Sequence, residues 1–179
     1  MEIIETSIKD LLIIQPKIFE DERGYFMEAF KESFIKENFP KIKFIQDNES
    51  KSSYGVLRGL HYQVPPYEQT KLVRVITGKV LDVALDLRPK SDTYGKWESI
   101  ILSDINKKQF LIPKGFAHGF IVLSETAILS YKVDNPYAPD YESGINFNDD
   151  NLKIDWKLSQ EEIIINNRDK NLPFLKCII

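Results

Sequence analysis

The chain has 179 residues, of which 42% are hydrophobic and 28% charged, a composition typical of one globular domain spanning residues 1–179. Its 24 basic and 27 acidic residues give a net charge of −3, which offers no electrostatic basis for binding nucleic acid or an anionic membrane. The only cysteine, Cys177, excludes an intrachain disulfide. We expect a cytoplasmic protein, because no signal-peptide pattern opens the chain and no apolar segment approaches about 20 residues.

The first predicted element is a helix over residues 30–39. Phe30, Phe34, Ile35 and Phe39 share one face at helical spacing, while the lysines and glutamates between them face water. Pro40 ends this pattern.

From residue 55 to residue 132 the pattern changes to short β-like runs separated by turn residues. Strands are predicted over 72–76, 80–87, 97–102, 110–112, 120–123 and 127–133, the first two joined by a tight turn at 77–79. Ser159 and Glu162 have the spacing of a capping box and predict a short helix over 159–163. The pattern predicts a mainly β sandwich, jelly roll or barrel with a few short peripheral helices.

Two segments contain the only histidines. In Arg58-Gly59-Leu60-His61-Tyr62-Gln63 an imidazole suited to general-base catalysis near neutral pH lies close to a cation that could bind an anion. A buried structural histidine in a strand is the simpler alternative. In the segment 112–120, Gly115 and Gly119 flank His118 and predict either close backbone approach or a corner of the β fold.

A metal site is not expected. Cupin-type metal sites use a His-x-His pair, but here the second position is Gln63, and no obvious carboxylate lies beside either histidine. A metal-dependent cupin dioxygenase is therefore the least favoured class.

Removal of a proton beside a carbonyl needs a base, a group that stabilises the enolate, and an acid for the opposite face. His61 could be the base, Lys71 the cationic stabiliser and Tyr131 the acid, and Asp169 could orient the histidine. A tyrosine in a strand usually serves packing, and a charged triplet near a terminus usually forms a solvated turn, so spacing alone leaves these roles open.

Taken together, these segments resemble the dTDP-4-dehydrorhamnose 3,5-epimerase family. The resemblance covers nearly the whole chain in order, and it is densest in Gly55-Val56-Leu57-Arg58-Gly59-Leu60-His61-Tyr62-Gln63. The other matching segments are residues 19–26, 46–48, 71–75, 82–88, 113–120, 131–132 and 142–145.

The resemblance implies a cupin-type jelly-roll β-barrel, a homodimer, no metal or other cofactor, and a dTDP-linked 4-keto-6-deoxy sugar as substrate. It implies that His61 removes the proton with Asp169 as its partner, that Tyr131 returns a proton from the other face, and that Lys71 stabilises the enolate. It also implies a set of residues lining the sugar-nucleotide site, some of them supplied by the dimer partner. These are Arg23, Phe26, Glu28, Gln46, Asn48, Arg58, His118, Glu142 and Arg168.

The sequence departs from the family pattern at three positions. Arg168 stands where lysine is common, Asn166 where serine is common, and Thr70 where glycine is frequent. The alternatives left open are a 3-epimerase or 3,4-ketoisomerase of another 4-keto nucleotide sugar, such as a GDP- or CDP-linked one, and a non-catalytic cupin that only binds a sugar nucleotide.

Overall fold

The computed structural model describes residues 1–177, and nearly all of its regular structure is antiparallel β. The strands are β1 Glu2–Glu5, β2 Leu12–Gln15, β3 Ile18–Asp21, β4 Gly24–Met27, β5 Gln46–Ser53, β6 Leu57–Gln63, β7 Lys71–Thr77, β8 Lys79–Asp86, β9 Trp97–Ser103, β10 Gln109–Ile112, β11 Phe116–Val122, β12 Thr126–Val133 and β13 Glu142–Gly144. The helices are α1 Glu32–Asn38 and α2 Asn167–Lys170, with 3-10 turns η1 Pro139–Tyr141 and η2 Leu175–Cys177.

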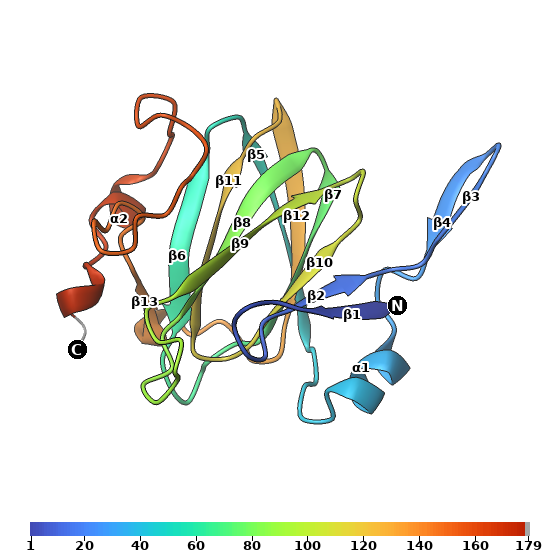
Figure 1. The fold of residues 1–179 in the computed structure, drawn as a ribbon, viewed down its shortest axis with the longest axis horizontal. Helices are drawn as coiled ribbons and strands as arrows, with labels where there is room; N and C mark the ends of the chain where they lie inside the picture. Colours follow the sequence, from blue (N-terminus) through green and yellow to red (C-terminus); the bar gives the residue numbers. More distant parts are fainter. Residues whose placement is uncertain (178–179) are drawn as a thin grey trace.

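Two sheets pack face to face and enclose the main core (Figure 1). One sheet has six strands in the order β1-β2-β10-β7-β12-β5, and the other has five in the order β13-β6-β11-β8-β9. Strand alternation sends every second residue inward, such as Val73 and Val75 on β7 and Phe116 and Phe120 on β11. The result confirms the expected cupin-type, mainly β fold with few short helices.

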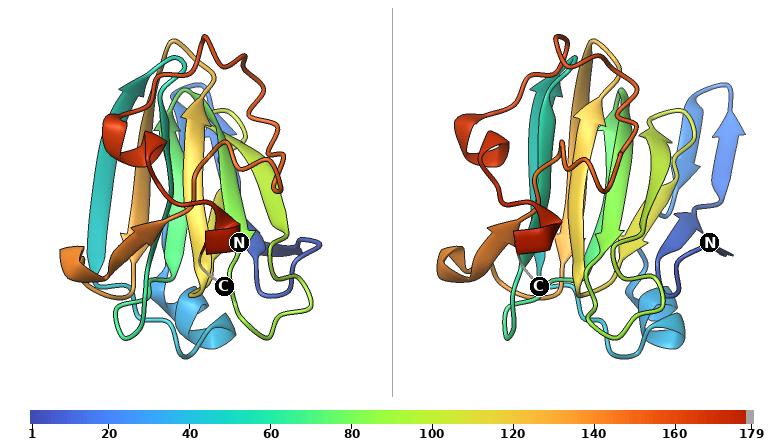
Figure 2. Two further views of the ribbon diagram at one scale, coloured as in Figure 1. Left: turned by 90° about the vertical axis from the view of Figure 1, so that its left-hand side faces the viewer. Right: turned by 60° about the vertical axis from the view of Figure 1, so that its left-hand side comes forward.

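Separate apolar layers cover the outer faces of both sheets. The C-terminal segment packs Leu152, Trp156 and Leu175 against the five-stranded sheet, which it crosses in Figure 2. Helix α1 packs Phe34 over the six-stranded sheet near Leu72 and Leu111. No helix within residues 1–177 is long and apolar enough to cross a membrane.

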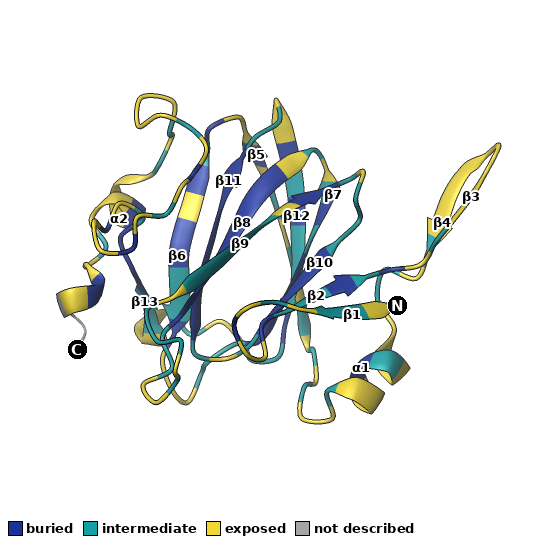
Figure 3. Cartoon of the chain, viewed as in Figure 1, coloured by how far each residue is buried: buried dark blue, intermediate teal, exposed yellow. Residues whose placement is uncertain are grey.

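The β3–β4 hairpin is a third, separate sheet that projects away from the body of the molecule (Figures 1 and 2). Figure 3 shows it as the most continuously exposed part of the chain. Phe19, Tyr25 and Phe26 are 51%, 54% and 66% exposed, values unusual for aromatic side chains in a folded protein. We call this hairpin the arm.

Most predicted elements are confirmed, and the differences have physical causes. The hairpin across Gly78 forms as predicted, and α1 begins two residues later than its apolar pattern. Strand β11 begins at Phe116, four residues before its predicted start, because Gly119 is accommodated inside the strand. The helix predicted over 159–163 is wrong: Ser159 and Glu162 do form capping-box hydrogen bonds, but the chain there forms a turn.

Candidate active site

A cavity of about 560 Å³ opens between the two sheets and brings together all four predicted catalytic residues. Strands of both sheets supply its walls, so groups from β6 and β11 face groups from β5, β7 and β12. Its lining residues include Asn48, Arg58, His61, Lys71, His118, Tyr131, Arg168 and Asp169, all of them predicted from the sequence.

A β-bulge in strand β6 directs both Arg58 and His61 into this cavity. The two residues are three positions apart, and regular alternation would send them to opposite faces of the sheet. The register between β6 and β11 pairs His118 with His61 but Phe120 with Arg58, so β6 contains one extra residue at this point. That extra residue brings the cation and the imidazole to the same face.

His61 and Asp169 form a hydrogen-bonded pair on one wall of the cavity. The His61 Nε2 lies 2.8 Å from Asp169 Oδ1, and the backbone N–H of Gly59 donates to Oδ2 at 3.0 Å. Burial raises the pKa of Asp169, but these hydrogen bonds outweigh it and hold the pKa below its usual value. The ionised carboxylate therefore accepts from Nε2–H, which leaves the Nδ1 lone pair of His61 available as a base.

Tyr131 reaches the cavity from β12 on the opposite sheet. Burial, followed by the charge of Glu142, raises the pKa of its phenol, while Arg58 partly opposes this shift. The phenol therefore keeps its proton at neutral pH, as an acid must. A base from one sheet and an acid from the other are suited to opposite faces of a ring held between them.

Lys71 lies deeper in the cavity, with only 9% of its surface exposed. Burial lowers its pKa to about 8, although the charges of Asp82 and Glu142 oppose this change. Its Nζ donates to the His61 carbonyl oxygen at 3.3 Å. A cation in such a water-poor site interacts strongly with a developing negative charge.

His118, which lines the same cavity, forms a second histidine–aspartate pair. Its Nε2 lies 2.9 and 3.0 Å from the two oxygens of Asp82, whose side chain is completely buried. Sequence reasoning did not select Asp82 as a site residue. The available signal was an acidic residue in the interior of the apolar strand β8, between the buried Leu81 and Val83.

The remaining predicted residues lie at the rim of the cavity or away from it. Glu142 accepts from Arg168 at 2.6 Å and from the exposed Tyr137 hydroxyl at 2.5 Å. Gln46 donates to Asn48 at 2.8 Å from the same face of β5, but it does not itself line the cavity. Arg23, Phe26 and Glu28 lie on the arm or at its base and line no part of the cavity in their own chain.

The departure at Asn166 has a local explanation, whereas the threonine side chain at position 70 has none. Asn166 caps α2 by accepting the Asp169 N–H at 2.7 Å, a role that asparagine and serine both perform well, so the helix start that places Asp169 is preserved. Thr70 uses its backbone N–H, which donates to Asp134 Oδ1 at 2.7 Å.

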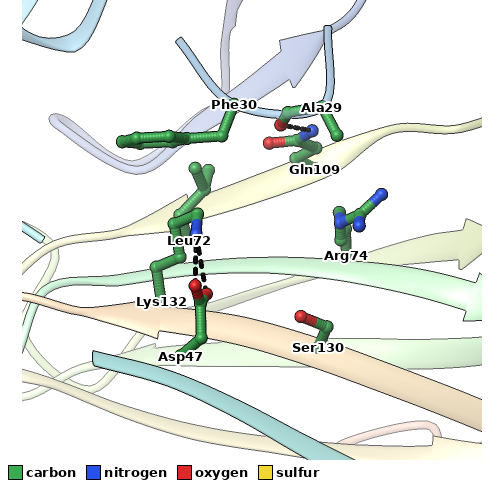
Figure 4. Close-up of a pocket in the computed structure, with 8 residues that line it drawn as sticks. All are labelled: Ala29, Phe30, Asp47, Leu72, Arg74, Gln109, Ser130 and Lys132. Carbon is green, nitrogen blue, oxygen red and sulfur yellow. Dashed lines mark hydrogen bonds and ion pairs between the residues drawn. The ribbon is translucent and has the colours of Figure 1, made fainter. Parts of the chain in front are cut away.

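A second, smaller cavity of about 160 Å³ lies on the outer face of the six-stranded sheet (Figure 4). Lys132 and Asp47 pair with each other there at 2.6 Å, and the Lys132 ammonium also lies over the Phe30 ring. No histidine or tyrosine lines this cavity, so it lacks the base and the acid predicted from the sequence. Residues 1–177 also contain no cluster of three or more His, Cys, Asp or Glu side chains positioned to hold a metal ion.

Comparisons with known proteins agree on one family. A family model described as dTDP-4-dehydrorhamnose 3,5-epimerase matches residues 5–176. A protein of that name from Methanothermobacter thermautotrophicus is 51% identical, over 94% of this chain and 91% of that protein. The crystal structure of the Elizabethkingia anophelis enzyme superposes with a TM-score of 0.95 at 50% identity, covering 99% of this chain and 97% of that one. A Legionella pneumophila epimerase in complex with dTDP-4-keto-L-rhamnose gives a TM-score of 0.94 at 47% identity, covering 99% and 94%.

Proposed function

The chain belongs to the dTDP-4-dehydrorhamnose 3,5-epimerase family, and from this premise we propose how its own residues invert carbons 3 and 5 of the sugar. The enzyme is an isomerase that converts dTDP-4-dehydro-6-deoxy-D-glucose to dTDP-4-dehydro-L-rhamnose. The observation that carries the proposed mechanism is the opposition of His61 on β6 and Tyr131 on β12 across one cavity. A cytoplasmic location is proposed as well, supported by a chain whose single cysteine permits no intrachain disulfide.

His61 is the proposed general base. Its Nδ1 takes the proton from carbon 3, and the C–H electron pair moves toward the carbon-4 carbonyl to form an enolate. Asp169 holds the ring in the required tautomer and stabilises the imidazolium that results. Lys71 Nζ stabilises the negative charge on the carbon-4 oxygen.

Tyr131 is the proposed acid for the opposite face. Its phenolic proton adds to carbon 3 from that side, which inverts the centre, and the tyrosinate then regains a proton from solvent as His61 loses one. The same two groups repeat the exchange at carbon 5. Two separate groups are required because a single shared base would tend to return the proton to the face it left.

The test is proton NMR of dTDP-4-keto-6-deoxy-D-glucose incubated with the enzyme in heavy water. We expect deuterium at both carbon 3 and carbon 5, and loss of exchange by a factor of about 10²–10⁴ in His61→Gln, the range for removal of a general base. Binding of dTDP measured by calorimetry controls for folding of this variant. Exchange at carbon 3 alone would indicate a 3-epimerase, and binding without exchange would indicate a non-catalytic sugar-nucleotide-binding protein.

We further propose that the enzyme is a homodimer in which the arm of one subunit completes the cavity of the other. The arm follows β2, and β5 beside the cavity is four strand spacings from β2, about 19 Å across the sheet. Strand β5 has no partner on its outer edge within residues 1–177, whereas the arm exposes aromatic side chains. An unpaired edge and an exposed hairpin are complementary between two copies, and the arm carries Arg23 and Phe26.

A further inference from the structure

Asp82 is a buried carboxylate in the middle of the apolar core. It lies on β8, between β11 and β9, and its inward neighbours Val80 and Ala84 belong to the core between the sheets. An ionised carboxylate in such surroundings is costly unless it is hydrogen-bonded. Within residues 1–177 its only hydrogen-bond partner is the imidazole of His118.

The geometry at His118 defines which ring nitrogen carries the proton. Because both Asp82 oxygens approach Nε2 and a carboxylate can only accept, Nε2 carries the proton. Burial lowers the pKa of His118, and Lys71 and His61 add to this although Asp82 opposes it, so the ring is neutral. Its Nδ1 is therefore a hydrogen-bond acceptor in the wall of the cavity.

Within residues 1–177 no carboxylate touches Lys71, although the charge of Asp82 acts to raise its pKa. No carboxylate in the described part of the chain pairs with its Nζ, which donates only to the His61 carbonyl oxygen, so further N–H groups remain for a ligand. The charged groups facing Lys71 are Asp82 of β8 and Glu142 of β13, beside His118 of β11, His61 of β6 and Tyr131 of β12. Strand β10, which pairs with β7, contributes no titratable side chain.

Of the two negative charges, only that of Asp82 is uncompensated. Glu142 is already engaged by Arg168 and Tyr137. Asp82 binds a neutral imidazole, and its charge is therefore left to act on Lys71. A cation that must meet an enolate oxygen needs such support, because a direct ion pair would occupy the N–H groups that the substrate requires.

We propose that Asp82 is a positioning residue for the epimerisation, which holds His118 as an acceptor through Nδ1 and keeps Lys71 a cation with free N–H groups. This inference rests on the proposed contact of Lys71 with the enolate oxygen. Asp82 touches no substrate and acts through these two side chains.

The test compares Asp82→Asn with Asp86→Asn, which removes a second fully buried carboxylate from the same strand. Asp86 binds Arg88, Ser91 and Thr93 and lies outside the cavity, so it controls for lost stability. The unmodified enzyme should lose kcat/KM as pH rises through about 8, where Lys71 loses its proton. In Asp82→Asn this fall in kcat/KM should occur about one pH unit lower. Relative to the unmodified enzyme, kcat/KM should then be roughly tenfold lower at pH 9 and little changed at pH 6.

Imidazole nitrogen NMR provides a readout that needs no turnover, since the chain contains only two histidines. We expect His118 to be neutral with the proton on Nε2 from pH 6 to 9, and to lose this single tautomer in Asp82→Asn but not in Asp86→Asn. A charged His118, or one protonated only on Nδ1, in the unmodified protein overturns the proposal even if Asp82→Asn fails to fold. The proposal is also overturned if kcat/KM of Asp82→Asn falls at the same pH as in the unmodified enzyme, or if Asp86→Asn shifts that pH equally. These results stand apart from the His61→Gln experiment, which tests the proposed mechanism itself.

Discussion

Each oxygen of the Asp169 carboxylate has its own donor, which orients the His61 imidazole before any substrate arrives. One oxygen accepts from His61 and the other from the backbone N–H of Gly59. With 1% of its side chain exposed, Asp169 has little access to water that could compete for these bonds. The proposed base is therefore preorganised, a condition for efficient proton transfer.

Replacement of the phenol by a phenyl ring separates the two proton transfers. In Tyr131→Phe we expect exchange at carbon 3 to stay within about tenfold of the unmodified rate, whereas net inversion falls at least about a hundredfold. The reason is that His61 and Lys71 still form the enolate, but no acid serves the other face. Exchange and product formation are measured together by NMR in heavy water.

Tyr62→Phe is the matched control for this prediction. Tyr62 also lies on a strand of the cavity wall, but it packs outward against the apolar layer on the far side of the five-stranded sheet. Its loss should leave both rates unchanged. Normal inversion by Tyr131→Phe would exclude the tyrosine as the acid.

At the scale of the element, the decisive feature is the close packing of β6 on β11. Gly59 has φ +129°, and a Cβ atom there would lie 2.5 Å from the Gly119 Cα and 2.8 Å from the His118 carbonyl oxygen. Only a residue without a side chain permits this approach, which supports the bulge that turns Arg58 and His61 to one face.

Gly59→Ala should therefore destabilise the protein by about 2–4 kcal/mol and reduce activity, because backbone atoms on both strands must move apart. Gly24→Ala is the control: Gly24 has a similar φ of +119°, but an added Cβ would meet nothing within 4 Å. That variant should lose only about 1 kcal/mol from backbone strain. Urea unfolding measures both changes, and equal losses would show that the contact with β11 is unimportant.

At the scale of the whole molecule, the arm and the cavity lie at opposite edges of the same sheet. The sheet order puts β2, from which the arm extends, four strands from β5. Arg23 of the arm and His61 of the cavity, which we propose act at one site, are therefore far apart in one chain. Two copies related by a twofold axis would bring each arm to the other cavity.

Mixing two inactive variants tests this arrangement. In a heterodimer of His61→Gln and Arg23→Ala, one site combines an intact cavity with an intact arm, and the other site lacks both groups. Random exchange of subunits makes half of the dimers mixed, so we expect roughly a quarter of the unmodified activity. The activity is measured after the two variants are unfolded and refolded together.

Either variant refolded alone is the control and should stay inactive. If the mixture is no more active than its parts, each arm would serve its own chain or play no part in catalysis.

Much of the fold and site was predictable because local patterns in the sequence are strong. Alternating apolar residues and the turn at Gly78 identified the β7–β8 hairpin and most strands from residue 71 to residue 133. Strands β1 to β5, which include the arm, were not predicted because they are short or polar. Strand β5, for example, has the sequence Gln-Asp-Asn-Glu-Ser-Lys-Ser-Ser. Helix α2, which carries Asp169, has only four residues, too few for a periodic pattern.

By itself, the sequence determined the class of fold and the family, and it predicted which groups move protons, because these follow from residue types and their order. Only the tertiary structure decided how those groups face one another. The bulge at Gly59 reverses the phase of alternation between Arg58 and His61, and a one-residue shift of this kind leaves no mark in a linear pattern. The role of Asp82 also required the fold, since a buried charge acquires meaning only from the side chains that surround it.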